Sequence, residues 1–277
     1  MADTAGTLAR TGSALRAYRL IAAMWLRASL AYRTSFWVTT VGNAATSVFD
    51  FVVIAIMFLH TSSLGGWTLP QVAFLYGTSG MTLGLADLAV GSLDQLGTRI
   101  RDGSVDTVLV RPAPALAQLS ADRFALRRVG RVTQSALVLA WAVSRLHIDW
   151  TAGRLLVTVG LVVCGTVIFA SVFIAGAAFQ FFAADASEVQ NSVTYGGATM
   201  LQYPPTIYAK QLVRGAVYGV PLAFVNWLPA MYVLGLRDTL GLPGWFRFAS
   251  PLAAAACATA AGLAWRAGLR SYRSTGS

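Results

Sequence analysis

Residues Leu155–Ala184 read LLVTVGLVVCGTVIFASVFIAGAAFQFFAA and contain no Asp, Glu, Lys or Arg. A helix crosses the hydrocarbon core of a bilayer with about 20 predominantly apolar residues, so this stretch is long enough to span a membrane. The rest of the 277-residue chain has the same character, because 56% of all residues are hydrophobic and only 12% are charged. A soluble domain carries about 25% charged residues. The composition therefore predicts an all-α, polytopic membrane protein and excludes a single soluble globular domain.

Further apolar stretches on both sides of this segment are candidates for membrane helices. They are residues 34–60, 72–93, 132–144, 189–209, 215–236 and 248–265. In the second of these, Gly80 and Gly84 form a Gly-x-x-x-Gly face, which predicts close packing against a neighbouring helix. Counted with Leu155–Ala184, the chain has seven candidates.

The distribution of arginine predicts the topology. Five Arg lie in residues 1–33, and three more follow the last apolar stretch. The positive-inside rule places both termini on the cytoplasmic side of the membrane, which we expect to be the cell (plasma or inner) membrane. Two termini on the same side require an even number of spans. We expect six, with residues 215–236 as a re-entrant hairpin, because Pro221 and Pro229 remove backbone donors and break a helix. In the alternative, residues 215–236 cross the membrane and residues 189–209 form a cytoplasmic loop.

The N-terminal segment predicts a helix at the membrane surface. Over residues 13–33, apolar residues and arginines fall on different helical faces, which suits a helix lying in the interface; alternatively it is the cytoplasmic start of the first span. Residues 1–33 then form a cytoplasmic N-terminus, residues 34–269 a single transmembrane domain, and residues 270–277 a cytoplasmic tail.

The chain lacks the motifs of common catalytic and nucleotide-binding sites. It has no G-x-x-x-x-G-K-[ST] loop, no G-x-S-x-G elbow and no H-E-x-x-H pair, and Lys210 is its only lysine. We expect no catalytic residue, no metal site and no bound cofactor on this chain, so that any ATPase is another protein. The net charge of +10 fits arginine held on the cytoplasmic side, and we expect no nucleic-acid partner.

The predicted cytoplasmic loop, residues 95–131, carries seven arginines and the sequence IRDGSVDTVLVRP at residues 100–112. Gly103 permits a turn, Asp106 can cap or orient a short helix, and Arg111-Pro112 ends that helix. A compact charged helix between two spans is suited to docking another protein. The alternative is a solvated loop whose arginines only set the topology.

This loop resembles the I-R-x-G-x-[LV]-D-x-x-L-[LV]-R-P pattern of ABC-2 type transporter permeases, in the six-helix "ABC-2 family transporter protein" group. Residues 202–208, QYPPTIY, and residues 221–229, PLAFVNWLP, are similar to that group's Q-Y-P-x-x-I-Y and P-x-A-F-x-N-x-x-P elements, and the ending RSYRSTGS is also similar. One departure is the second proline, Pro205, which lies near the end of the fifth candidate helix and is expected to alter that end.

The resemblance implies a permease subunit of a type V ABC exporter that has six transmembrane helices and no ATPase of its own. It implies a dimer with a second copy or a related permease, and two separate ABC ATPase subunits that bind ATP and Mg. It also implies a coupling helix and an extracellular re-entrant hairpin at about residues 208–246. The residues carried over are Arg101, Asp102, Gly103, Asp106, Arg111 and Pro112 for coupling, and Pro221, Asn226 and Pro229 for the hairpin.

Polar residues in the apolar stretches are candidates for a substrate pathway. A charge at mid-bilayer costs about 2.5 to 3.5 kcal/mol, so Asp50 should face protein or water and either line a path or serve as a structural partner. Asn191, Tyr195, Thr199 and Gln202 recur at helical spacing on one face, which we expect at a dimer interface or in helix packing. The pathway candidates are Asp50, Asn191, Tyr195 and Gln202. We expect Asp87 and Asp94, nearer the cytoplasmic end, to be solvated.

Two functions remain at this point. The first is the permease of an ATP-driven exporter of an amphiphilic substrate such as a drug, a lipid or a secondary metabolite. The second is a proton-coupled secondary transporter that uses Asp50 and Asp87 as proton carriers. The absence of an evident internal repeat counts against the second.

Overall fold

The computed structural model describes residues 16–25, 27, 41–42, 49, 51–122, 127–183, 187–237 and 239–273. These residues are helical apart from turns and one isolated bridge between Leu64 and Trp67. The predicted all-α class is confirmed. Asp50, the tail beyond residue 273 and most of the first candidate span lie outside the described residues.

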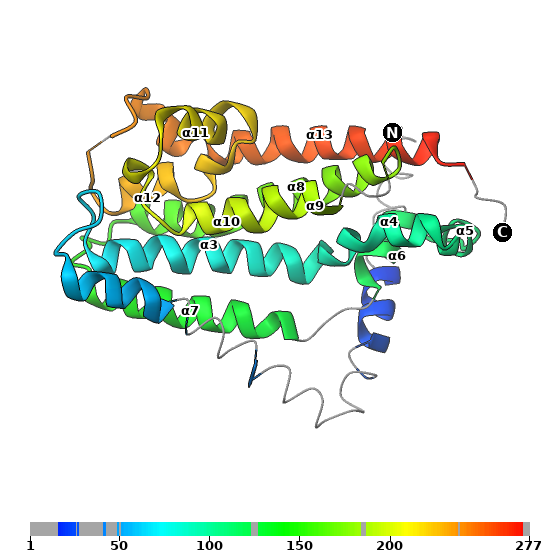
Figure 1. The fold of residues 1–277 in the computed structure, drawn as a ribbon, viewed down its shortest axis with the longest axis horizontal. Helices are drawn as coiled ribbons and strands as arrows, with labels where there is room; N and C mark the ends of the chain where they lie inside the picture. The colour runs from blue at the N-terminus through cyan, green and yellow to red at the C-terminus, as the bar shows by residue number, and fades with distance from the viewer. Residues whose placement is uncertain are drawn as a thin grey trace.

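Four long helices lie side by side and form the body of the molecule (Figure 1). They are α3 (Leu69–Val90), α7 (Arg127–Arg145), α8 (Ala152–Gln180) and α13 (Ser250–Ser271). Helix α3 packs against α7 on one side and α8 on the other, and α8 also packs against α13. A shorter helix, Phe51–His60, joins the α3–α7 pair, since the Phe51 ring contacts Tyr76 and Trp141 at centroid distances of 5.4 and 5.9 Å.

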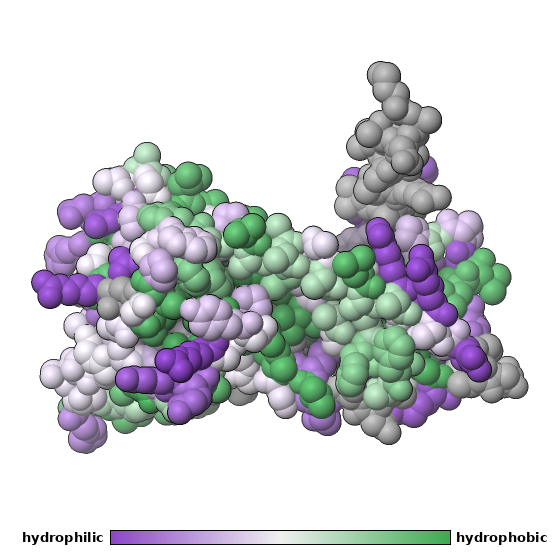
Figure 2. All heavy atoms as spheres, turned by 90° about the horizontal axis from the view of Figure 1, so that it is seen from above, coloured by the Kyte–Doolittle hydropathy of each residue, from purple (hydrophilic) through white to green (hydrophobic). Residues whose placement is uncertain are grey.

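Two of these helices, α8 and α13, are long and apolar enough to cross a membrane. The structure extends the third candidate stretch, because α7 begins at Arg127 rather than at residue 132. In Figure 2, hydrophilic residues gather toward the two ends of the visible face, and its middle is mostly apolar. This distribution fits a bilayer around the middle of the long axis of the molecule. The count of six membrane spans stays a prediction.

Glycines bring α3 and α7 into close contact. A Cβ atom added to Gly77 would lie 2.8 to 2.9 Å from the Cβ and backbone of Leu139, and one added to Gly84 would lie 2.8 Å from Val132. Gly80 faces Ser135 in the same way. The predicted close packing of Gly80 and Gly84 is confirmed, α7 is the partner, and Gly77 extends the contact.

The fifth candidate stretch is a helix with a wide turn in its middle. It consists of α9 (Ser187–Asn191), the π-helical η2 (Ser192–Gly196) and α10 (Gly197–Leu201). π-Helical turns inside α-helices are rare and often occur at functional positions. After Pro204 the chain forms the short 3-10 helix η3 (Pro205–Ile207).

The next region is bent, as predicted. Helix α11 (Lys210–Arg214) continues into the π-helical η4 (Gly215–Gly219), and after Pro221 the chain forms η5 (Leu222–Phe224) and α12 (Trp227–Val233). The two halves meet at 81°. Pro221 lies at the break, but the expectation that Pro229 also breaks the helix is wrong. Pro229 lies in the first turn of α12, where backbone N–H groups have no partner within the helix and proline is tolerated.

Most of the apolar core lies between α3, α8 and the α12 region. Its largest fully buried side chains include Phe74, Phe169, Phe173 and Trp227. The remaining 3-10 helix, η6 (Gly244–Phe248), precedes α13. The segment with α11 and α12 lies at one end of the molecule, and the loop between α3 and α7 lies at the other (Figure 1).

Candidate functional site

The loop between α3 and α7 folds into several short helices rather than the single helix expected from the sequence. They are η1 (Gly91–Gln95), α4 (Leu96–Arg101), α5 (Ser104–Leu109) and α6 (Ala115–Ala121). We call α4, α5 and α6 the coupling unit. The unit lies at the same end as the C-terminus of α13 and the helical residues 16–25, which lie across the direction of the long helices (Figure 1).

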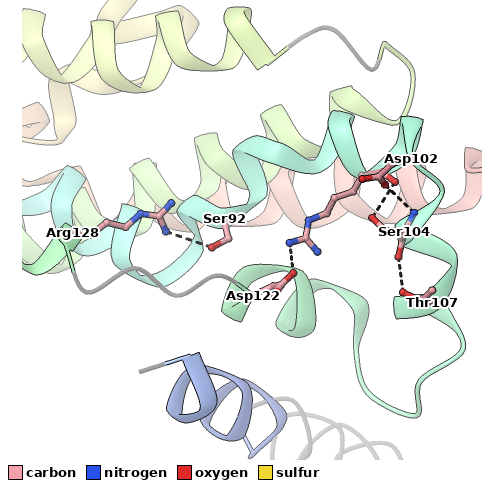
Figure 3. Close-up of polar contacts among 7 residues, drawn as sticks. Ser92, Asp102, Ser104, Thr107, Asp122 and Arg128 are labelled. Atoms are coloured by element: carbon pink, nitrogen blue, oxygen red, sulfur yellow. Dashed lines mark hydrogen bonds and ion pairs between the residues drawn. The ribbon is translucent and has the colours of Figure 1, made fainter. Parts of the chain in front are cut away.

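The joint between α4 and α5 is a tight turn at Gly103. The φ angle of Gly103 is +70°, in the left-handed region that glycine adopts at little cost, so the predicted turn is confirmed. The Asp102 carboxylate accepts a hydrogen bond from the Ser104 backbone N–H at 3.0 Å, and Thr107 Oγ1 donates to the Ser104 carbonyl at 2.8 Å (Figure 3). Helix α5 ends at Leu109, ahead of Pro112, as expected.

Helix α6 closes the coupling unit. The buried Gln118 Nε2 donates to the carbonyls of Ala113 at 2.7 Å and Val108 at 3.2 Å. Arg99 of α4 forms an ion pair with Asp122, which follows α6. These contacts connect α4, α5 and α6 into one body.

An apolar cluster joins the coupling unit to the long helices. Val105 and Val108 of α5 and Leu119 of α6 pack with Ala177 of α8 and Trp265 of α13. On the opposite side of the unit, the outer residues of α5 and the turn after it are exposed. Val110 is 86% exposed and Leu109 is 40% exposed, next to exposed Arg101, Asp102, Arg111 and Pro112.

The structure divides the six predicted coupling residues into two groups. Arg101, Asp102, Arg111 and Pro112 are exposed at the outer side of the unit, and Arg101 Nη2 also contacts Thr98 Oγ1 at 3.2 Å. Gly103 forms the turn. Asp106 is half-buried and faces inward, where its Oδ1 accepts a hydrogen bond from the Tyr272 hydroxyl at 2.9 Å.

Leu109 and Val110 were not singled out from the sequence. Helical periodicity could have found Val110, because Val105 and Val108 share the buried face of α5 and a residue two positions after Val108 points away from that face. Leu109 lies four residues after Val105, so periodicity would place it on the buried face and its exposure required the structure. Exposed apolar side chains beside charged ones are typical of surfaces that contact another protein.

A buried ion-pair cluster lies just inside the coupling unit. Asp87, on α3, is 5% exposed; its carboxylate contacts Arg128 Nε at 3.1 Å and Arg131 Nη1 at 3.7 Å, both on α7. Arg128 Nη1 also donates to the Asp87 carbonyl at 3.1 Å. The same Nη1 contacts Ser92 Oγ at 3.5 Å (Figure 3). The expectation that Asp87 is solvated is wrong, because its carboxylate is enclosed between helices and paired with arginines. Asp94 is half-buried in η1.

The π-helical turn meets this cluster. The Tyr195 hydroxyl donates to Asp87 Oδ1 at 3.4 Å, its ring contacts Phe173 at a centroid distance of 6.0 Å, and the Arg131 guanidinium lies 5.5 Å from its ring centroid. Of the other predicted pathway residues, Asn191 and Gln202 are half-buried. Thr199, which belongs to the same predicted polar face, is exposed. Asp50 lies outside the described residues, and the pathway role of all four candidates stays a prediction.

Asn226 forms a second buried polar junction, at the other end of the molecule. It is 0% exposed, and its Nδ2 donates to the carbonyls of Leu75 on α3 and Leu201 on α10, both at 3.1 Å. Nearby, Trp227 Nε1 donates to the Tyr203 carbonyl at 2.9 Å. The bend at Pro221 is therefore tied to α3 and α10 through Asn226, a partner arrangement that the sequence does not indicate.

Together, these contacts position the outer side of the coupling unit, the ion-pair cluster at Asp87 and the polar junction at Asn226. Among residues in the described ranges, no group of three or more His, Cys, Asp or Glu side chains is placed to hold a metal ion. The arrangement suits a protein that docks a partner at the coupling unit and moves helices against one another.

Comparison with known protein families identifies the family of this chain. The family model described as "ABC-2 family transporter protein" matches residues 44–276, a range that includes the coupling unit, the bent region and α13. No curated protein and no solved structure is significantly similar to the chain.

Proposed function

This chain belongs to the ABC-2 family of transporter proteins, and we propose that it is the permease subunit of an ATP-driven exporter that moves an amphiphilic substrate out of the cell. The family match confirms the resemblance carried by residues 100–112, 202–208 and 221–229. A permease of this family is the membrane component of an ABC transporter, is not itself catalytic, and works with an ABC ATPase.

The outer surface of the coupling unit is the observation that carries the proposal. It presents the apolar side chains of Leu109 and Val110 between charged residues, on a unit that is fixed from beneath by its own apolar cluster. A unit that is packed onto the long helices moves together with them when a bound partner displaces it, whereas a flexible loop would move alone. The coupling unit is therefore better interpreted as a docking site for an ATPase than as a solvated loop.

Four contacts would carry such a displacement into the membrane helices. Gln180, at the end of α8, accepts a hydrogen bond from the Gly97 N–H of α4, and its Nε2 donates to Gln190 Oε1 of α9 at 2.7 Å. Arg128 and Tyr195 tie α7 and the π-helical turn to Asp87. Transport needs two arrangements of the helices whose balance ATP binding shifts.

The two ends of the molecule fit the proposed orientation. The coupling unit and the C-terminal end of α13 lie at one end, which we place in the cytoplasm, and the bent α11–α12 region lies at the other, which we place outside as a re-entrant hairpin (Figure 1). Residues 16–25 would lie in the inner interface. The complex would contain two ATPase subunits, which bind ATP and Mg, and a second copy of this chain or a related permease, in the cell membrane.

The pairing of Asp87 disfavours the alternative of proton-coupled transport. A proton carrier must exchange protons with water, but the Asp87 carboxylate is enclosed and held by Arg128, Arg131 and Tyr195. Those contacts suit a link between α3, α7 and the π-helical turn.

Affinity purification from the native host tests the proposal. We expect the tagged chain to recover a stoichiometric ABC ATPase, identified by mass spectrometry, and a Gly/Ser replacement of residues 101–111 to lose it. Val110→Asp, which puts a charge in the contact, should weaken recovery, whereas His147→Asp, at an exposed position between α7 and α8, should leave it unchanged. Retention of the ATPase by the Gly/Ser variant would contradict docking at this unit.

A further inference from the structure

We propose that Tyr272, directly after α13, is a positioning residue that holds α5 through Asp106. This contact makes α13 move together with the coupling unit. The inference rests on the proposed function, because α5 is the helix that the ATPase would displace. It assigns a role to a residue 166 positions away along the chain.

The hydroxyl of Tyr272 is the contact between α13 and α5 that carries the inference. Tyr272 directly follows the last residue of α13, Ser271, and donates to Asp106 Oδ1 at 2.9 Å. Partial burial and the hydrogen bond to Asp106 raise the pKa of Tyr272 to about 12. The hydroxyl therefore keeps its proton, and can donate to Asp106, throughout the physiological pH range.

The ring of Tyr272 is held by aromatic contacts at the ends of α8 and α13. It packs against Phe181 at a centroid distance of 5.9 Å, and Phe181 packs against Trp265 at 5.5 Å. Beneath these rings α13 approaches α8 closely, since a Cβ atom added to Gly268 would lie 2.8 Å from the Ala178 carbonyl oxygen. The last turns of α13 and the end of α8 thus act as one support for the hydroxyl.

Helix α5 depends on outside contacts for its orientation. It has only six residues, and helices shorter than about 12 residues are marginal on their own in water. The Val105 and Val108 side chains hold it through non-directional packing. Directional contacts add to this: Ser104 Oγ donates to the Arg99 carbonyl of α4, Gln118 of α6 donates to the Val108 carbonyl, and Tyr272 donates to Asp106. Loss of the Tyr272 contact removes a directional bond between α5 and the end of α13 and leaves the apolar packing with Trp265.

Hydrogen exchange of the full chain in lipid nanodiscs tests the contact without any ATPase. Tyr272→Phe keeps the ring on Phe181 and removes only the hydroxyl, so we expect faster amide exchange in residues 104–110 and unchanged exchange in α3. Thr259→Val is the matched control, because Thr259 is an exposed hydroxyl residue of α13 whose Oγ1 donates to the Ala255 carbonyl of its own helix. Unchanged exchange in residues 104–110 of Tyr272→Phe would overturn the proposal.

ATPase turnover of the purified complex tests the role. We expect Tyr272→Phe to recover the ATPase in normal amounts, to lower kcat by on the order of threefold to tenfold, as loss of one hydrogen bond allows, and to leave KM for ATP unchanged. Asp106→Ala should match it and the double variant should be no worse, whereas Asp106→Asn, whose amide oxygen still accepts, should retain most of the turnover.

These outcomes separate the inference from the proposed function. If the wild-type chain recovers no ATPase, the proposed function fails, and the hydrogen-exchange result still decides whether Tyr272 holds α5. If the ATPase is recovered and Tyr272→Phe exchanges faster in α5 but turns over ATP at the wild-type rate, Tyr272 has no part in coupling and the inference is overturned. Additive losses in the double variant would overturn it equally.

Discussion

Asn226 is a fully buried amide among apolar helices, and its contacts explain why it is there. The Leu201 carbonyl lies in the last turn of α10, where carbonyls lack partners within the helix, and Nδ2 of Asn226 satisfies it. The same amide bonds to the Leu75 carbonyl on α3. One side chain thus fixes the bent region against two helices.

Replacement of this amide should destabilise the protein. In Asn226→Leu the Leu201 carbonyl loses its side-chain donor inside the protein, at a cost of about 1 to 3 kcal/mol. We expect a lower melting temperature of the detergent-purified chain. Ser192→Ala, which removes an exposed hydroxyl bonded to its own helix, should melt like the wild type. Equal melting of Asn226→Leu and wild type would show that the junction contributes nothing to stability.

The Asp87 cluster makes a second prediction at this scale. Asp87→Asn leaves Arg128, whose side chain is 12% exposed, without its closest counter-charge, and breaking a buried pair in this way costs about 3 to 5 kcal/mol. We expect little folded protein by fluorescence-detected size-exclusion chromatography, with partial recovery in Asp87→Asn/Arg128→Gln. A well-folded Asp87→Asn protein that loses transport would instead support the proton-carrier function.

Residue-scale features differ in how far the sequence predicts them. The turn at Gly103 and the end of α5 before Pro112 depend on local backbone chemistry, so the sequence predicts both. The partners of Asp87, Asp106 and Asn226 come from distant parts of the chain. Because no pattern in the sequence shows which helices become neighbours, these contacts required the structure.

At the scale of elements, glycines on α3 set its distance from α7, whereas Gly160 on α8 faces open space. The same substitution should therefore have opposite effects at the two sites. In Gly77→Ala the new methyl group meets the backbone of Leu139, which cannot move aside easily, and we expect a loss of about 1 to 3 kcal/mol from overpacking. Gly160→Ala should stabilise its helix by up to about 1 kcal/mol.

Thermal melting of both variants in the same detergent checks this pair. A melting temperature of Gly77→Ala at or above that of Gly160→Ala would contradict the close contact between α3 and α7.

The elements also show where sequence reasoning stops. Apolar stretches and flanking charges predict α3, α8 and the start of α13 within a few residues, whereas α13 continues to Ser271, beyond the predicted end at residue 265. Proline chemistry predicts the bend at Pro221. The π-helical turn at Ser192–Gly196 packs against α8, and the three short helices of the coupling unit pack against α3 and α8, segments that are distant in the sequence. Local propensity gives little indication of either.

At the scale of the whole molecule, the structure has two different ends joined by long helices. One end carries the coupling unit, fixed to α8 and α13, and the other carries the bent region, fixed to α3 and α10 through Asn226. Because α3, α8 and α13 run from one end to the other, a displacement of the coupling unit would reach the bent region through rigid helices. The proposed docking surface for the ATPase is therefore the outer side of the coupling unit.

Site-specific photo-crosslinking in the native membrane tests this docking surface. A benzoylphenylalanine at Val110, on the outer side of the coupling unit, should crosslink to the ABC ATPase. The same residue at Asp149, whose side chain is 98% exposed at the opposite end of the long helices, should not. A crosslink to the ATPase from Asp149 and none from Val110 would contradict the docking site and the orientation together.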